Sequence, residues 1–239
     1  SATMNPVTWR VWARNLARTA RNFGSGDLGA RITVDSPIQE LAELNQSFNQ
    51  MADKLQTRQQ QQETDSLHIA ELNRLYSLLS AVNQTIVSAN SRRELLRRIC
   101  QIAIENGGFA LAWTGFVDGD TQELAPVMHA GDAAFLQHGE RPEGPSPAAT
   151  AYHSGRVAVV NDIARNPPGI WRDSAYAAGF RAAVGVPLSQ REQVVGVLTL
   201  YATTPGFFDA TELRLLEEVG GDISYALDRL DSEAARQVA

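Results

Sequence analysis

Few side chains in this sequence are arranged for chemistry. The four histidines are His68, His129, His138 and His153, and no two are spaced to share one helix face, as the ligands of a helical metal site do. The single cysteine, Cys100, excludes a disulfide framework and any site built from several thiolates. It falls on the apolar side of a predicted helix, so we expect a buried hydrophobic residue there. No Ser/His/Asp order or phosphate-binding loop is present, which disfavours an enzyme.

Aromatic and polar residues of the second half of the chain favour the binding of a small apolar or planar ligand. The candidate pocket residues are Trp171, Tyr176, Phe180, Tyr152, Asp162, Arg181 and His129. Among them, Asp162 and Arg181 are candidate polar anchors. Two alternatives stay open: the aromatic side chains fill the space as ordinary core, and Arg181 is a surface charge on an edge strand. The identity of any cofactor is unknown from the sequence.

The composition is that of a globular protein. The chain has 239 residues, 44% of them hydrophobic and 20% charged, with a formal net charge of −6. This negative charge argues against a general nucleic-acid binder, and no apolar run approaches the length of a membrane span. The charge is uneven, because residues 1–26 contain four arginines and no acidic residue: Arg10, Arg14, Arg18 and Arg21.

Two short helices joined by a glycine-containing connector are predicted for residues 9–55. The first carries core residues at heptad spacing, namely Trp9, Trp12, Leu16, Thr19 and Phe23. Gly24-Ser25-Gly26 ends it, and Ser36-Pro37 is a good start for the second. The second helix has a seam of apolar residues three and four apart: Leu41, Leu44, Phe48, Met51 and Leu55. Such seams need partner helices, so we expect a parallel homodimer that forms a four-helix bundle.

The seam positions become polar between Gln56 and Ser66, where Arg58, Gln62 and Asp65 occupy them. Apolar spacing resumes from Ile69 onward, and nothing in between breaks a helix, so residues 37–88 are predicted to form nearly one continuous helix. The alternative is a flexible glutamine-rich linker between two domains.

A mixed α and β pattern follows. The capping box Ser91 to Glu94 opens a helix, and two hairpin strands are expected at residues 109–117 and 123–129, with a turn at 118–120. A loop at 141–147, a helix at 148–153, a strand at 157–160 and a helix at 171–178 come next. Strands at 181–188 and 193–201 precede a helix from Asp209 to about Leu230. This order predicts an antiparallel sheet with helices on one face and a loop-walled cavity on the other.

The first 50 or so residues resemble a HAMP domain, the linker that follows the last membrane helix in bacterial sensors. The resemblance covers residues 9–58 and lies in Gly26-Asp27-Leu28, Arg31-Ile32-Thr33-Val34, Glu40-Leu41, Leu44, Phe48-Asn49 and Met51. One departure is Trp12, which stands where the family usually has a proline. The resemblance implies a location on the cytoplasmic side of the bacterial inner membrane, with membrane attachment through a missing N-terminal segment.

Residues 72–231 resemble a GAF domain, and residues 59–71 are then a helical linker. The segments that carry this resemblance are 104–109, 112–118, 155–156, 159–163, 186–188, 196–201, 207–209 and 212–213. Cyclic-nucleotide GAF domains carry an Asn-Lys pair near the end of the last central strand, where this chain has Tyr201-Ala202, so that ligand is disfavoured. Some GAF domains hold haem through one histidine, for which His129 and His153 are candidates.

The sequence therefore predicts an α+β protein: a HAMP coiled-coil module, a long connecting helix and a GAF domain with an antiparallel sheet flanked by helices. We expect a signal-transducing sensory segment that is not itself an enzyme. The resemblance implies a full-length receptor whose output is a diguanylate cyclase or phosphodiesterase, or a histidine kinase. The alternatives are a stand-alone enzyme, a haem-binding GAF sensor and a purely structural dimerisation unit.

Overall fold

The computed structural model describes residues 6–32, 39–117, 124–132, 136 and 146–238. The chain divides into two compact units, residues 1–71 and 72–239, and each is considered by itself. The boundary falls inside one uninterrupted helix, α2 (Gln39–Ser88). Among the described helices, none combines the length and the apolar character that crossing a membrane requires.

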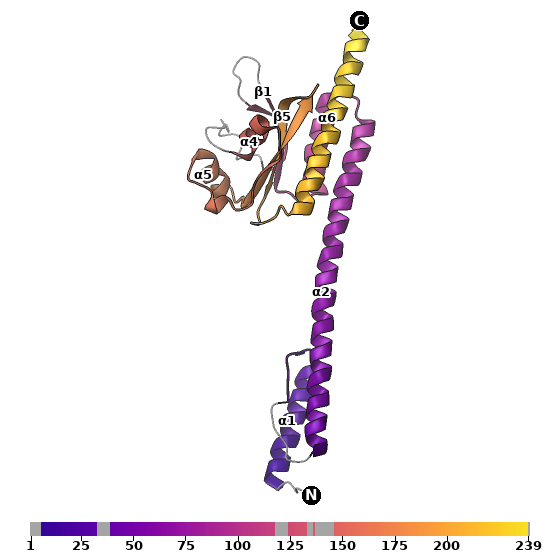
Figure 1. Cartoon of the computed structure of the whole chain (residues 1–239), viewed down its shortest axis with the longest axis vertical. Coiled ribbons are helices and arrows are strands. Elements are labelled where there is room, and N and C mark those ends of the chain that lie inside the picture. Colours follow the sequence, from indigo (N-terminus) through magenta and orange to yellow (C-terminus); the bar gives the residue numbers. More distant parts are fainter. Residues whose placement is uncertain (1–5, 33–38, 118–123, 133–135, 137–145, 239) are drawn as a thin grey trace. The chain divides into compact units, whose positions relative to one another are not determined.

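The first unit pairs helix α1 (Pro6–Gly24) with the beginning of α2 (Figure 1). Helix α1 starts three residues before the predicted Trp9, because a proline suits the first helical position. It ends at the predicted glycines, where Gly26 has a φ of +106° that a residue with a side chain rarely adopts. The predicted helix start at Ser36-Pro37 lies outside the described residues.

The connector of this unit is held to α2 by side chains. Asn49 accepts a hydrogen bond from the backbone N–H of Ile32 (2.9 Å) and donates one to its carbonyl (3.0 Å). Arg31 pairs with Asp53 at 2.6 Å and with Gln56 at 2.8 Å. Ile32 is buried as a result, so the connector is anchored at its apolar point.

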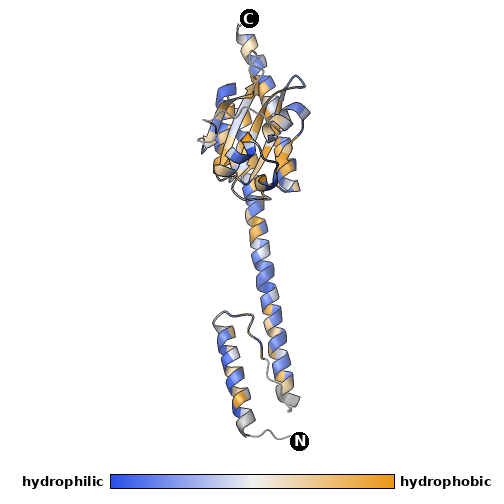
Figure 2. Cartoon of the chain, turned by 90° about the vertical axis from the view of Figure 1, so that its left-hand side faces the viewer, coloured by the Kyte–Doolittle hydropathy of each residue, from blue (hydrophilic) through white to orange (hydrophobic). Residues whose placement is uncertain are grey.

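Helix α2 continues through the polar stretch, which confirms the predicted long connecting helix. Figure 2 shows this middle part as mostly hydrophilic. Two pairs of side chains one turn apart support it, Gln59 with Glu63 (3.0 Å) and Gln61 with Asp65 (2.8 Å). His68 is exposed on this helix.

The second unit is built on one five-stranded sheet, which confirms the α+β prediction. Its elements after α2 are α3 (Arg92–Glu105), β1 (Leu111–Val117), β2 (Leu124–Gly131), α4 (Pro147–Ser154), β3 (Ala158–Val160), the 3-10 helix η2 (Ile163–Arg165), α5 (Ile170–Ala177), β4 (Ala182–Gln190), β5 (Gln193–Ala202) and α6 (Ala210–Val238). The strand order is β2-β1-β5-β4-β3, with every neighbouring pair antiparallel. The predicted turn at 118–120 and most of the loop at 141–147 lie outside the described residues.

Both predicted capping boxes are present. Ser91 Oγ accepts from the Glu94 N–H at 3.2 Å, and Asp209 Oδ1 accepts from the Glu212 N–H at 2.8 Å. The last helix is longer than expected, since it runs to Val238 rather than to about Leu230. The added segment contains no glycine or proline, and residues such as Glu233 and Ala234 favour helix, so nothing ends it earlier.

Helices cover both faces of the sheet. One face packs on α3, α6 and the end of α2 through residues such as Ile99, Leu200 and Ile223. The other is not left to loops alone, contrary to the expectation of a loop-walled cavity, because α4 and α5 pack on it (Figure 1). Gly185 permits this: a Cβ there would stand 2.3 Å from the Pro147 carbonyl oxygen at the start of α4.

Candidate ligand-binding site

The candidate site lies on the sheet face that α4 and α5 cover. Because side chains alternate along a strand and neighbouring strands align residue to residue, Trp113 of β1 and Thr199 of β5 are register partners on this face. Leu111 and Tyr201 form the next pair on the same face. The Trp113 ring lies over Gly115, where a Cβ would meet it at 2.5 Å. The sheet thus presents a tryptophan, a hydroxyl and a tyrosine side by side.

Two polar atoms of this face have no hydrogen-bond partner among the residues that the structure describes. They are the indole Nε1 of Trp113 and the hydroxyl oxygen of Thr199, both inaccessible to solvent. Their residues are 1% and 0% exposed, respectively. Buried polar groups in native proteins are nearly always paired, and leaving one unpaired costs about 1–3 kcal/mol. The face therefore holds a donor and a hydroxyl whose hydrogen-bonding capacity is unused in this state.

The aromatic cover of the site comes from α5 and the segment after it. Trp171 is buried, and its Nε1 donates to the hydroxyl of Tyr201 at 3.0 Å. Phe180 packs against the Tyr201 ring, tilted by 42°, with 4.9 Å between ring centroids. Tyr152 of α4 is partly buried against the same cluster. Three predicted pocket residues, Trp171, Phe180 and Tyr152, are thus brought together.

Tyr176, Arg181 and Asp162 are placed around the edge of this cluster. Tyr176 is 41% exposed, and the Arg181 guanidinium lies 4.1 Å from its ring centroid. Arg181 also donates to the carbonyls of Tyr176 and Phe180, at 3.1 and 2.8 Å. Asp162 caps η2 through the Ala164 N–H (3.1 Å) and pairs with Arg165. These contacts give each residue a local structural role.

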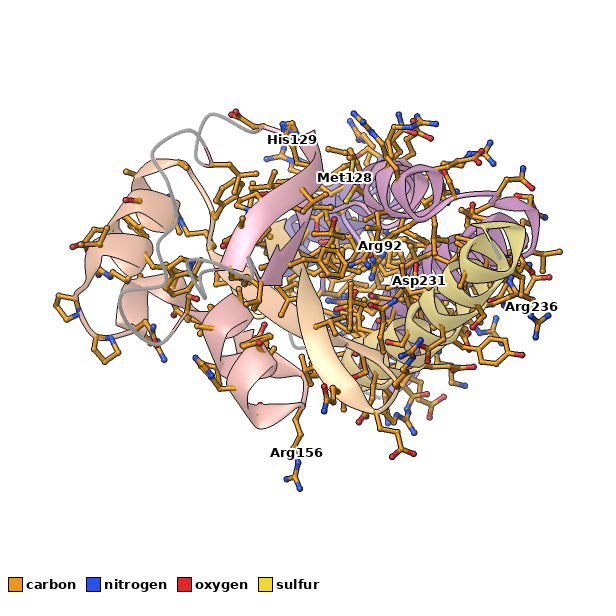
Figure 3. The ribbon with its side chains drawn as sticks, turned by 90° about the horizontal axis from the view of Figure 1, so that it is seen from above. Arg92, Met128, His129, Arg156, Asp231 and Arg236 are labelled. Carbon is orange, nitrogen blue, oxygen red and sulfur yellow. The ribbon has the colours of Figure 1, made fainter. Side chains whose placement is uncertain are left out.

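His129 lies on the outer strand β2 as the register partner of Trp113, so its side chain is on the site face. It is exposed, while its neighbour Met128 packs toward the helices (Figure 3). His153 is exposed at the end of α4, where its ring contacts Tyr152. His138 lies outside the described residues. No group of three metal-binding side chains occurs in the described parts of the chain.

Cys100 belongs to the opposite side of the sheet. It is buried on α3 in the cluster that includes Ile99 and Leu200, as predicted. Burial raises the pKa of its thiol to about 12, and the neighbouring Thr114 only partly offsets this. The thiol is therefore protonated at neutral pH and separated from Trp113 and Thr199 by the sheet.

Sequence reasoning missed Trp113, Thr199 and Tyr201 as site residues. A signal was present in β5, where Thr199 is the one hydroxyl residue in the apolar run from Val194 to Leu200. Thr199 becomes a candidate site residue only because Trp113, 86 positions earlier in the sequence, is its register partner in the sheet.

A buried ion pair ties α2 to α6 within the second unit. Arg74 of α2 pairs with Glu212, which is buried in the first turn of α6. Arg74 also donates to the Gly107 carbonyl (2.6 Å) after α3, and its guanidinium lies 5.1 Å from the Phe207 ring centroid. Through Arg74, α2 thus contacts α6, the segment that follows α3 and the ring of Phe207.

The predicted dimer seam in the first unit is largely uncovered within one chain. Leu44, Met51 and Leu55 are 46%, 46% and 38% exposed, whereas Phe48 contacts Phe23 with ring centroids 5.4 Å apart. The Leu41 side chain lies outside the described part. Ala52, one residue beyond Met51, is the fully buried position. A single chain therefore leaves most of this apolar seam open to solvent.

Comparison with protein families identifies the chain's class. A GAF domain model matches residues 89–228, more than half of the chain, and a HAMP domain model matches residues 13–57. The chain belongs to the GAF domain family and carries a HAMP domain ahead of the GAF domain. It is thus a signalling sensory module, since both domains serve that purpose. No curated protein matches the sequence.

Solved structures agree on the fold. The free methionine-R-sulfoxide reductase of Neisseria meningitidis is 21% identical with a TM-score of 0.56, covering 69% of this chain and 92% of that one. A domain of a two-component sensor histidine kinase protein from Sinorhizobium meliloti is 16% identical (TM-score 0.53; 63% and 100% covered). The GAF domain region of a membrane protein from Geobacter sulfurreducens is 22% identical (TM-score 0.50; 56% and 91% covered). At these identities the likeness establishes the fold alone.

Proposed function

We propose that this chain is the signal-relaying sensory segment of a bacterial membrane receptor. In this proposal the HAMP domain exchanges conformational change with a membrane segment, the GAF domain senses or regulates, and a C-terminal output domain responds. The output is a diguanylate cyclase or phosphodiesterase, or a histidine kinase. The family assignments and the single helix α2 that belongs to both units support the relay.

The observation that carries a sensory role is the unpaired couple of Trp113 and Thr199. A ligand that enters between the sheet and α5 can accept a hydrogen bond from the Trp113 indole and exchange one with Thr199. The described cluster around them is aromatic and aliphatic, so it suits a small, neutral, planar molecule with a carbonyl or similar acceptor. Binding would supply hydrogen bonds to these two groups, and a ligand that binds one conformation better than another shifts the conformational equilibrium toward it.

Thr199→Val is the decisive variant, because valine keeps the shape and removes the hydroxyl. We expect the ligand-free protein to gain about 1 kcal/mol of stability, since an unpaired buried group disappears. Any small molecule seen by native mass spectrometry in the freshly purified protein should be lost. Thr114→Val is the matched control, because the Thr114 hydroxyl is equally buried and also lacks a partner among the described residues but lies on the Cys100 side of the sheet; it should gain similar stability without changing ligand retention. Destabilisation by Thr199→Val, or equal ligand loss in both variants, would contradict the site.

We further propose that two copies associate in parallel through the seam of Leu41, Leu44, Phe48, Met51 and Leu55. The exposure of three of these residues in a single chain supports this, because a second copy would remove that apolar surface from water. Light scattering at tens of micromolar should give the mass of two chains; a strictly monomeric mass would refute the dimer.

We propose that the segment is not itself an enzyme, although some solved structures of this fold are methionine sulfoxide reductases. Thiol chemistry needs an accessible thiolate, and the chain's one thiol is buried with its pKa raised to about 12. Turnover of free methionine-R-sulfoxide by purified protein, supplied with dithiothreitol, would overturn this. A haem-binding sensor is the second candidate, favoured by His129 on the site face; a Soret band that His129→Ala abolishes would establish it.

A further inference from the structure

The four arginines of α1 form one stripe along the helix. Arg10, Arg14, Arg18 and Arg21 are separated by four, four and three residues, so they share one face over about 16 Å at about 1.5 Å per residue. All four are exposed. We call these residues the arginine stripe.

The arginine stripe lies outside the core of the helical bundle. With Trp9, Trp12, Leu16, Thr19 and Phe23 in the core positions of the heptads, each stripe arginine falls at an outer position. Charged residues that pair with a neighbouring helix occupy the flanking positions instead. Trp12 and Thr19 are buried on the opposite face. Dimerisation therefore leaves the stripe on the outside.

The chain itself offers the stripe little negative charge. Residues 1–26 hold these four basic residues and no acidic one, so their formal charge is +4, while the rest of the chain, with 17 basic and 27 acidic residues, carries −10. Among the described residues, the contact recorded for the stripe is one from Arg18 to the amide oxygen of Asn15 at 3.3 Å. The four guanidinium groups are thus exposed, and no carboxylate of the described residues pairs with them.

An apolar element lies within the stripe. Val11 is 57% exposed, and with Ala17 it lines the same surface hollow as Arg14, Arg18 and Arg21. Guanidinium groups around an apolar strip match a lipid headgroup region, where phosphates lie next to glycerol and acyl carbon. A nucleic acid would offer phosphates without a matching apolar layer, and it would also meet the −10 charge of the remaining chain.

From this geometry we infer that the arginine stripe of α1 binds the anionic phospholipid headgroups of a membrane surface. The inference rests on the proposed function, which sets the HAMP domain next to a membrane, and adds that α1 itself contacts the lipid. Binding is electrostatic, so it depends on the fraction of anionic lipid and weakens as salt shortens the Debye length.

Cosedimentation of the whole 239-residue chain with vesicles tests this. At low salt we expect binding to vesicles of phosphatidylcholine with a quarter phosphatidylglycerol, weak binding to pure phosphatidylcholine, and release at 0.5 M NaCl. Replacing all four stripe arginines by glutamine should lower the partition coefficient by roughly two to three orders of magnitude, about five-fold for each charge. Replacing them by lysine, which keeps the charge, should retain most of the binding.

The matched control removes four exposed arginines from the GAF unit: Arg93, Arg97, Arg156 and Arg214, each changed to glutamine. Arg156, for example, points away from the body of the unit (Figure 3). This control should bind vesicles within about three-fold of the parent chain. Any of four results would overturn the inference. Two concern variants: an equal loss of binding in the control, or a loss of binding in the lysine variant. The other two are equal binding to neutral vesicles and tighter binding to a duplex DNA of 20 base pairs. Dimer mass and the Thr199→Val result do not involve lipid, so failure here and failure of the proposed function can be told apart.

Discussion

At the scale of single residues, the Trp171 and Tyr201 side chains join the α5 cover to the sheet through one hydrogen bond of 3.0 Å. Because Trp171 is buried, we predict that Trp171→Ala loses about 3–5 kcal/mol of unfolding free energy. Tyr201→Phe, which removes only the hydroxyl, should cost about 1–2 kcal/mol. Chemical denaturation measures both, and a fully stable Trp171→Ala would mean that α5 is a loosely held cover.

The raised pKa of Cys100 predicts a stability loss at alkaline pH. An unfolded thiol ionises near its ordinary pKa, about 8.5–9, while the folded thiol keeps its proton to about 12. Between these values the unfolded state binds fewer protons than the folded state, so stability falls as pH rises. From pH 8 to 10, Cys100→Ala should lose about 1–2 kcal/mol less than the parent protein in urea titrations. Parallel pH profiles for the two proteins would contradict the raised pKa.

Because Glu212 is buried and pairs with Arg74, we expect a single substitution of Arg74 to destabilise the protein more than a double substitution of both residues. Arg74→Met leaves the Glu212 carboxylate buried without that cation, which should cost about 3–5 kcal/mol. Adding Glu212→Gln removes the buried charge and should restore most of the lost stability. Thermal and urea unfolding of both variants measures the difference. Equal stability of the single and double variants would show that the pair does not hold α2 to α6.

At the scale of elements, a charge placed in the apolar seam of α2 should weaken the association of two chains. In the proposed dimer, Phe48→Asp places two carboxylates in the seam and should weaken association by at least 100-fold. Leu67→Asp is the control, because Leu67 is on the same helix, 74% exposed and outside the seam positions. Sedimentation equilibrium compares the two. A dimer unaffected by Phe48→Asp would place the interface elsewhere.

At the scale of the whole molecule, we propose that the polar seam positions Arg58, Gln62 and Asp65 let the HAMP and GAF domains influence each other along α2. They are exposed in a single chain and resist burial without partners, so two packing registers of the dimer can have similar energies. The alternative is a spacer without this role. Changing all three to leucine should raise dimer stability and, in the full-length receptor, hold the output on or off regardless of stimulus. Changing Gln60, Glu63 and Thr64 to leucine, off the seam, is the control; a normal stimulus response in the seam variant would refute the relay.

Much of this architecture followed from local sequence. The capping residues Ser91 and Asp209, the glycines after α1 and the alternation within β4 and β5 act over a few positions, so the sequence alone determined the elements and the family. The burial of Cys100 also followed, because helical periodicity placed it on an apolar face. The end of α6 did not, since no residue there marks a stop.

The candidate site was decided by tertiary structure. Trp113 and Thr199 become a pair through the register of β1 with β5, and Gly185 lets α4 approach the sheet closely. Tyr176 and Arg181, aromatic and charged residues close in sequence to Trp171, instead pack on each other at the edge. Register and packing join residues far apart in the chain, and their energies depend on partners that composition and spacing do not specify. Local periodicity and capping therefore predict helices and strands, whereas the side chains that meet at the site depend on strand register and on packing between distant segments.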